Sequence, residues 1–173
     1  VAFLLPAPRS SSLGGAPVPP PRAAASLAAW LIQAGHDVAL IDGREPDPGG
    51  GAAAFRPDLV LLPAAARTWP EAAVLARAFR AAGEASVAVF GPHASLFPDD
   101  VLGESAVDCA VLGDPEETVL QLLEQPSQWQ GIDGLAWRGE GGVERGRPRR
   151  PFPDLDALPP AAWDLVDLDR CGL

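Results

Sequence analysis

Short apolar runs alternate with amphipathic stretches along the first 124 residues of the chain. Five runs are almost wholly apolar, as strands buried on both faces are, and they cover residues 1–5, 38–41, 58–62, 87–90 and 107–112. Between them, apolar residues at helical spacing predict helices over 22–34, 70–82 and 116–124, with shorter helical turns over 52–55 and 99–102. This alternation predicts an α/β fold with a five-stranded parallel sheet and helices on both faces.

A different pattern follows residue 126. Segments 135–138 and 143–145 flank the glycine-rich segment 139–142, which predicts a β-hairpin with a glycine turn. Beyond it, 148–160 is rich in proline and extended, and 163–170 carries apolar residues that we expect to pack on this domain or on a partner. The chain is therefore expected to divide into a Rossmann-like domain over 1–126, a β-hairpin appendage over 127–150 and a linker over 151–173.

Charge and composition exclude several classes of partner. The net charge is −10, and the one basic cluster, 145–150, lies in a stretch rich in proline and glycine that is typical of a solvated loop. Because duplex-binding domains present a basic face, nucleic acid is not an expected partner. No apolar stretch approaches the length of a membrane span, so a membrane is not expected either. Cys109 and Cys171 form no disulfide framework, which favours the cytoplasm, and Cys109 lies in an apolar run and is expected to be buried.

Several functions common on α/β sheets lack their residues in this chain. Lysine is absent, which excludes a phosphate loop of the GxxxxGK[ST] type. No GxGxxG follows the first strand, no GxSxG occurs, and the third strand ends at Pro63 where a phospho-acceptor domain would have aspartate. The two histidines, His36 and His93, stand outside any cluster of metal ligands. We therefore predict neither a metal site nor a catalytic residue.

The candidate site lies in the loops after the strands, because ligands of parallel sheets bind at the carboxyl ends of the strands. Gly91 lets the backbone approach a ligand closely, although a strand-to-helix turn that merely needs glycine is an alternative. Trp69 offers a flat apolar face to a ring-shaped ligand, or else caps the core. The acidic segment 113–118 would repel a bare phosphate but can accept hydrogen bonds from ribose or amide groups.

Six segments of the chain, taken in order, carry a resemblance to a known family. Two of them are the strand segments 38–43 and 57–62. Two follow strands: GPHASLFP (91–98) is similar to a GGPHPTLLP motif, and VLGDPEET (111–118) is similar to a VRGEGEET motif. The last two lie nearer the C-terminus: IDGLAWR (132–138) is similar to an I-x-G-L-x-Y-R hairpin, and PDLDALPPAAWD (153–164) is similar to a DLDSLPFPAWD linker. In this order and spacing they resemble the cobalamin-binding domain at the N-terminus of radical SAM enzymes, in the methyltransferase-like class. The resemblance implies that the α/β fold is of the flavodoxin-like (Rossmann-like) type. The resemblance covers nearly the whole chain, although each motif alone is weak.

The resemblance implies a position for the cofactor. Cobalamin would lie across the carboxyl ends of the strands, with its nucleotide tail among the loops after strands one, four and five and with the loop after strand three beneath the corrin. No DxHxxG motif follows the first strand, so a lower axial histidine is absent, which in this family suits methyl transfer. The implied cofactor contacts are Ser11, Ser12, Leu13, Gly14, Arg67, Thr68, Trp69, Gly91, Pro92, His93, Gly113, Asp114 and Glu116.

The resemblance also implies a role within a larger enzyme. The chain lacks a CxxxCxxC motif for a [4Fe–4S] cluster, so we expect it to hold cobalamin without catalysing a reaction alone. A radical SAM barrel, in cis or in trans, would supply the cluster and S-adenosylmethionine, and the parent enzyme would be a methyltransferase or a related ring-modifying enzyme. Phe90, Pro63 and the Asp114-Pro115 pair depart from the family pattern and bear on cofactor binding. Two alternatives stay open: a degenerate standalone protein that binds a partner through its tail without a cofactor, and a flavodoxin-like binder of another nucleotide.

Overall fold

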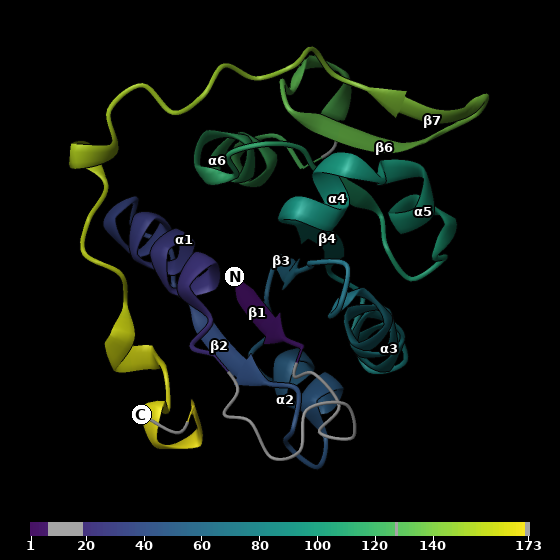
Figure 1. Ribbon diagram of the computed structural model, residues 1–173. Coiled ribbons are helices and arrows are strands. Elements are labelled where there is room, and N and C mark those ends of the chain that lie inside the picture. The colour runs from purple at the N-terminus through teal and green to yellow at the C-terminus, as the bar shows by residue number, and fades with distance from the viewer. Residues whose placement is uncertain (7–18, 127, 172–173) are drawn as a thin grey trace.

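The computed structural model describes residues 1–6, 19–126 and 128–171, and its centre is one seven-stranded sheet (Figure 1). Its spatial order is β2-β1-β3-β4-β5-β6-β7. The first five strands pair in parallel in the flavodoxin-like order, and the last two pair antiparallel. The strands are β1 (Ala2–Leu5), β2 (Ala39–Asp42), β3 (Leu59–Pro63), β4 (Ser86–Phe90), β5 (Cys109–Val111), β6 (Leu135–Gly139) and β7 (Gly142–Arg145).

The predicted fold class is confirmed, and the strand count differs because the hairpin continues the sheet. In β6, Leu135 and Trp137 pack into the core on one face of the sheet, and Ala136 packs into the core on the other. A strand that is apolar on both faces needs cover on both sides and a hydrogen-bonding neighbour, and β5 supplies that edge, with Cys109 opposite Trp137. The division of the chain at residues 126 and 150 stays a prediction.

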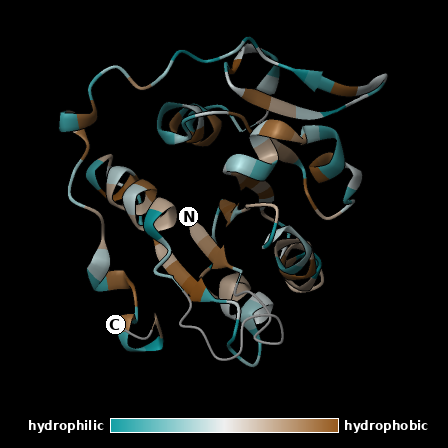
Figure 2. Cartoon of the chain, in the orientation of Figure 1, coloured by the Kyte–Doolittle hydropathy of each residue, from teal (hydrophilic) through white to brown (hydrophobic). Residues whose placement is uncertain are grey.

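Helices cover both faces of the sheet (Figure 1). Helices α1 and α6 lie over one face, where the core includes Phe3, Leu61 and Phe90. The other helices lie over the opposite face, where Leu4 and Leu62 are buried, so successive strand residues alternate between two cores. In Figure 2 strands β1 and β2 are largely brown, while the helices mix brown with teal. The helices are α1 (Arg22–Gln33), α2 (Pro48–Ala54), α3 (Trp69–Arg80), α4 (Pro92–Leu96), α5 (Pro98–Gly103) and α6 (Glu116–Glu124).

Two helical elements differ from the sequence expectation. The turn expected at 52–55 is the end of α2, which begins earlier because Pro48 occupies its first turn and the Asp47 carboxylate accepts a hydrogen bond from the Gly50 N–H at 2.9 Å. Helix α4 was not expected, and it begins directly after β4 at Pro92. Its presence makes the segment after β4 a strand-to-helix junction at Gly91, which shapes the site described below.

The C-terminal tail packs on its own domain. After β7 the chain passes outside α6 and α1 and ends beside β2 (Figure 1), with short 3₁₀ turns at Leu155–Ala157, Trp163–Leu165 and Leu168–Cys171. The Ala162 N–H donates to the Ala25 carbonyl of α1 at 3.0 Å, and the Phe152 and Trp30 rings meet edge to face at 5.4 Å. Trp163, however, stays 38% exposed, so the tail is only partly covered.

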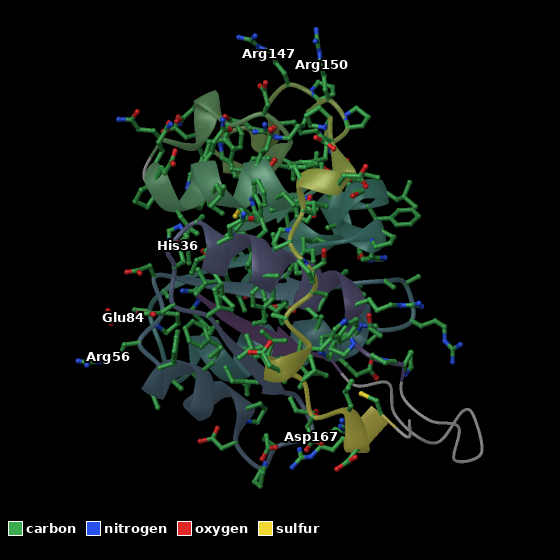
Figure 3. The ribbon with its side chains drawn as sticks, turned by 90° about the vertical axis from the view of Figure 1, so that its left-hand side faces the viewer. His36, Arg56, Glu84, Arg147, Arg150 and Asp167 are labelled. Carbon is green, nitrogen blue, oxygen red and sulfur yellow. The ribbon has the colours of Figure 1, made fainter. Side chains whose placement is uncertain are left out.

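The basic cluster is not wholly solvated, which corrects the expectation. Arg147 and Arg150 do point outward at the top of Figure 3. The Arg149 side chain is only 11% exposed, and it donates to the Thr118 hydroxyl at 2.7 Å and to the Glu117 carboxylate at 2.7 Å. Because Thr118 is fully buried in α6, Arg149 fixes the segment after the hairpin against that helix. Arg149 faces inward because the Glu117, Thr118 and Gln121 side chains of α6 provide it with acceptors.

Both cysteines are free and buried, as expected for Cys109. Burial raises the pKa of the Cys109 thiol far above its usual range, so it behaves as a small apolar side chain. Across the described ranges, every helix is too short or too polar to traverse a bilayer.

Candidate functional site

A cavity lies at the carboxyl ends of β1, β3 and β4. Strand β1 pairs with β2 on one side and β3 on the other, so this is the point where a flavodoxin-like sheet reverses its strand order and forms a crevice. The cavity has a volume of about 260 Å³. His36, Arg56 and Glu84 mark the opposite, amino edge of the sheet at the left of Figure 3. Mostly apolar residues line the cavity: Leu5, Pro6, Pro19, Pro20, Pro21, Ala23, Pro63, Ala64, Ala65, Thr68, Phe90, Gly91 and Pro92.

Main-chain contacts at Gly91 join the ends of β3 and β4. The Ala64 N–H donates to the Phe90 carbonyl at 2.8 Å, and the Ala64 carbonyl accepts from the His93 N–H at 3.0 Å. Gly91 has a φ of 105°, and an added Cβ would lie 2.9 Å from the Ala64 oxygen. Only glycine fits this position without strain, so the structure supports the turn interpretation of Gly91 and also places it on the cavity wall.

The loop between β3 and α3, residues 64–68, is called the β3 loop below. The Ala65 N–H donates to the Thr68 hydroxyl at 3.0 Å, and the Ala65 carbonyl accepts from the Thr68 and Trp69 N–H groups, each at 2.9 Å. Ala66 and Arg67 are exposed at its tip. The loop is therefore internally hydrogen-bonded, with Thr68 on the cavity and Arg67 facing solvent.

His93 lies between two aromatic rings. Its ring stacks on Trp69 with centroids 5.4 Å apart and planes 25° apart, and its other neighbour is Phe97 at 5.3 Å. His93 Nε2 lies 2.8 Å from the Asp100 carboxylate, and its side chain is 11% exposed. Trp69 also packs against the core beneath α3, so at least one of its ring faces is already occupied. These contacts favour the core-capping interpretation of Trp69.

The loop after β5, residues 112–115, is called the β5 loop. The Gly113 N–H donates to the Ser95 hydroxyl at 3.0 Å, and Ser95 in turn donates to the Gly91 carbonyl at 3.1 Å. Ser95 thus links the β5 loop to the junction after β4. The Asp114 carboxylate accepts a hydrogen bond from the Phe152 N–H at 2.9 Å, which ties the β5 loop to the linker. Sequence reasoning placed Asp114 on the cofactor and did not anticipate this contact.

Glu116 begins α6 and is partly buried. Desolvation raises the pKa of its carboxyl group, and the neighbouring charges of Asp114 and Glu117 raise it further, while its own backbone N–H acts in the opposite direction. A carboxyl group in this state can donate a hydrogen bond at a higher pH than an exposed one. Its role as a cofactor contact stays a prediction.

A second cavity, of about 320 Å³, lies at the ends of β1 and β2 under the C-terminal tail. Arg170 contacts the Glu45 carboxylate at 2.5 Å, and Arg44 donates to the Arg170 carbonyl at 3.0 Å. Burial alone would raise the pKa of Asp42, but the hydrogen bonds and charge of Arg44, with the charge of Arg170, outweigh it and hold that pKa below its usual range. Leu5 and Pro6 line both cavities, so the two share a wall.

The structure brings together part of the predicted site. Thr68, Gly91 and Pro92 line the first cavity, and Gly113 connects to it through Ser95. Asp114 and Glu116 contact neither that cavity nor the second one. The predicted residues Ser11, Ser12, Leu13 and Gly14 lie outside the described residues. Among the described residues, no group of three histidine, cysteine, aspartate or glutamate side chains could hold a metal ion.

Sequence reasoning missed most of the apolar lining. Pro19, Pro20 and Pro21 stand before α1, and Leu5 and Pro6 end β1. Proline clusters on both sides of a long loop at the first strand were the available signal, because proline fixes φ and leaves an apolar ring on a loop surface. Ser95 was also missed as a link between loops, although it stands within the segment that carried the family resemblance.

Relatives and solved structures match this architecture. An uncharacterized methyltransferase of Pyrococcus horikoshii is 29% identical over 161 residues, which are 87% of this chain and 35% of the relative. The anaerobic magnesium-protoporphyrin IX monomethyl ester cyclase of Synechocystis sp. is 28% identical over 166 residues, which are 87% of this chain and 32% of the relative. The chain thus spans about a third of the length of these relatives.

Two solved structures share the fold. The radical S-adenosylmethionine methyltransferase TsrM from Kitasatospora setae, solved with cobalamin and a [4Fe–4S] cluster, has a TM-score of 0.71 at 20% identity, covering 92% of this chain and 30% of its own. The cobalamin-dependent S-adenosylmethionine radical enzyme OxsB, solved with aqua-cobalamin, has a TM-score of 0.76 at 15% identity, covering 99% of this chain and 25% of its own. Residues 16–123 match the family described as the B12 binding domain. Since this match spans more than half of the sequence and contains four of the five parallel strands, β2 to β5, the chain belongs to the B12-binding domain family.

Proposed function

We propose that this domain binds cobalamin along the carboxyl edge of its sheet and serves as the cobalamin module of a radical SAM enzyme of the methyl-transferring kind. The observation that carries the proposal is the apolar cavity at the strand-order reversal, most of whose lining residues lie in the family-matched segment 16–123. It offers a flat, largely apolar group a surface of proline and alanine side chains. The similarity of this chain to a methyltransferase and to the solved cobalamin-dependent radical enzyme OxsB supports the same function.

The residues around the cavity fit this cofactor. Gly91 and Pro92 would contact the nucleotide tail and Thr68 the corrin, because they line the cavity from two neighbouring strand ends. Gly91 keeps the backbone free of a side chain at the wall. Phe90, which departs from the family's glycine pair, is 1% exposed and packs edge to face on Phe3 at 6.1 Å, so its ring is largely in the core. The departure at Phe90 therefore leaves the cavity open.

Neither histidine of the chain is placed to ligate cobalt from below. His36 lies at the amino edge, and the ring of His93 is engaged by Asp100, Trp69 and Phe97. The exposed tip of the β3 loop, with Arg67, would face the corrin instead. A cobalt centre without a protein imidazole suits methyl transfer by analogy with the family.

The larger setting follows from the same analogy. Bound cobalamin would supply a cobalt centre able to carry a methyl group, and this chain would hold and orient it. A radical SAM barrel, in cis or in trans, would supply the [4Fe–4S] cluster and S-adenosylmethionine. We place the protein in the cytoplasm, because its two buried cysteines are free thiols.

Reconstitution with hydroxocobalamin tests the proposal. After desalting, we expect corrin absorbance to remain with the protein, and the paramagnetic resonance of the reduced, Co(II) form to lack nitrogen splitting from a protein histidine. A colourless protein after desalting contradicts the proposal and favours the alternative of a cofactor-free module.

A matched pair of variants places the ligand in the cavity. Ala65 and Ala82 are both exposed, but Ala65 lines the cavity, whereas Ala82 lies away from it between α3 and β4. Ala65→Phe should fill the cavity and abolish cobalamin retention, whereas Ala82→Phe should leave it unchanged. Equal retention by the two variants would show that cobalamin binds elsewhere.

A further inference from the structure

His93 contacts both ends of the β3 loop. At the start of the loop, the His93 N–H donates to the Ala64 carbonyl at 3.0 Å. At its end, the His93 ring stacks on Trp69, the first residue of α3, at 5.4 Å. The ring is itself fixed by Asp100 at 2.8 Å and by Phe97 on another side. One residue of α4 therefore holds a loop that belongs to a different strand.

Among the described residues, the tip of the loop has no comparable support from other elements. Ala65, Ala66 and Arg67 are exposed, and the hydrogen bonds that involve Ala65 stay within residues 65–69. The position of the tip relative to the sheet therefore depends on the two ends, where the contacts of His93 lie. Loss of the ring contact would free Trp69 to adopt other χ1 wells, of which a side chain has up to three.

We propose that His93 is a positioning residue: through its ring, clamped by Asp100 and Phe97, it holds the β3 loop in the conformation that receives cobalamin. This inference rests on the proposed function. It also gives His93 a different role from the direct cofactor contact that the sequence suggested, since Nε2 is paired with Asp100, the ring packs on Trp69 and Phe97, and Nδ1, which has no hydrogen-bond partner among the described residues, is buried.

The expected effect on affinity follows from preorganisation. An apparent dissociation constant rises by the inverse of the fraction of molecules in the binding-competent conformation. If Trp69 distributes over two or three χ1 wells in place of one, the dissociation constant for hydroxocobalamin should rise roughly two- to threefold, or by about 0.4–0.7 kcal/mol. Any aromatic ring at position 93 should restore part of this loss, because stacking on Trp69 needs only a flat face.

Three variants separate the roles of His93. His93→Ala removes the ring and its bond to Asp100 but keeps the main-chain N–H to Ala64, and we expect the two- to threefold weaker binding together with a shifted spectrum of the bound corrin. His93→Phe keeps a ring for stacking and should bind more tightly than His93→Ala. His36→Ala, the matched control at the amino edge, should bind like the unmodified protein.

Hydrogen exchange of the cofactor-free domain provides a second readout. The Ala64 N–H is bonded to Phe90, and the Thr68 and Trp69 N–H groups to Ala65. In His93→Ala the amides of residues 64–69 should exchange faster, while those of β1 keep their protection. In His36→Ala neither segment should change.

The two hypotheses fail in distinguishable ways. If the unmodified protein loses cobalamin on desalting, the proposed function is wrong, and exchange over 64–69 still tests the positioning role. If the unmodified protein binds and folded His93→Ala binds with the same affinity and spectrum, the inference is overturned. The same holds if His93→Ala only lowers the urea midpoint of unfolding, because a residue that merely stabilises the fold leaves binding to the folded molecules unchanged.

Discussion

Replacement of Gly91 by alanine tests the junction on which the candidate site depends. The backbone there has φ 105° and ψ −173°, a region open almost only to glycine, where another residue costs about 1–3 kcal/mol. The new Cβ would also lie 2.9 Å from the Ala64 oxygen, so the hydrogen bond from the His93 N–H to that oxygen would lengthen or break, at about 1 kcal/mol. We expect Gly91→Ala to lower the free energy of unfolding by about 2–4 kcal/mol, a large part of the ~5–15 kcal/mol of a typical domain.

Two other glycines provide graded controls for that measurement. Gly113 has a φ of 78° with nothing within 4 Å of an added Cβ, so Gly113→Ala should show the backbone strain alone, about 1–2 kcal/mol. Gly103 has neither a positive φ nor a close neighbour, and Gly103→Ala at the end of α5 should be neutral or stabilising by up to about 1 kcal/mol. Urea unfolding followed by circular dichroism, with unchanged m values, would measure all three. A cost for Gly91→Ala no larger than that for Gly113→Ala would refute the close-approach argument.

Three further predictions concern the linker and α6. Arg149→Ala should lower the free energy of unfolding by about 2–4 kcal/mol in urea melts, because it leaves buried acceptors unpaired. Arg147 is exposed, so Arg147→Ala should change the free energy of unfolding by no more than about 0.5 kcal/mol. Equal effects of the two variants would contradict the role of Arg149 as a buried hydrogen-bond donor. Burial holds the pKa of Glu116 in the folded protein above its ordinary 4.5, so the unfolded chain loses this proton first as pH rises, and ionisation of Glu116 destabilises the fold. Glu116→Gln should therefore raise the urea midpoint at pH 7 and lose that advantage below about pH 4. A difference in midpoint that does not depend on pH would refute this role of Glu116. Arg170→Ala should speed amide exchange in the last 3₁₀ turn without moving the urea midpoint, since its contact with Glu45 is exposed; an unchanged exchange pattern would show that the turn is held by other contacts.

Much of the fold followed from periodicity. The five parallel strands were predicted because runs such as 58–62 are apolar on both faces, and a strand of that kind is stable only inside a covered parallel sheet. The order of the strands came from the family resemblance and not from the pattern itself. Periodicity could not predict that the hairpin joins the sheet. The apolar pattern of 135–138 indicates a strand, but its pairing with β5 depends on which edge of the finished sheet is free.

The candidate site was predictable only as a set of loops. The carboxyl ends of the strands were predicted as its place, since topology fixes which loops share an edge, and a cavity lies there. Long-range contacts decide which side chains in those loops face the cavity, and no local signal carries them. Asp114 shows this, because its carboxylate is paired with the Phe152 N–H, 38 residues away in the sequence. Trp69 is a second example, since its ring stacks on His93 of α4, which follows a different strand.

The two sides of the carboxyl edge differ in how their polar groups are used. On the β5 side, Asp114 is bonded to the linker, Gly113 to Ser95, and Thr118 to Arg149, so these groups already have partners within the protein. Around the cavity formed by β1, β3 and β4, the described lining residues are mainly proline and alanine, and Thr68 is the one polar side chain among them. A ligand seated there gains chiefly by removing apolar surface from water, at about 25 cal/mol per Å². Affinity at this edge is therefore governed by the shape of the cavity, and shape in turn depends on how firmly the β3 loop is held.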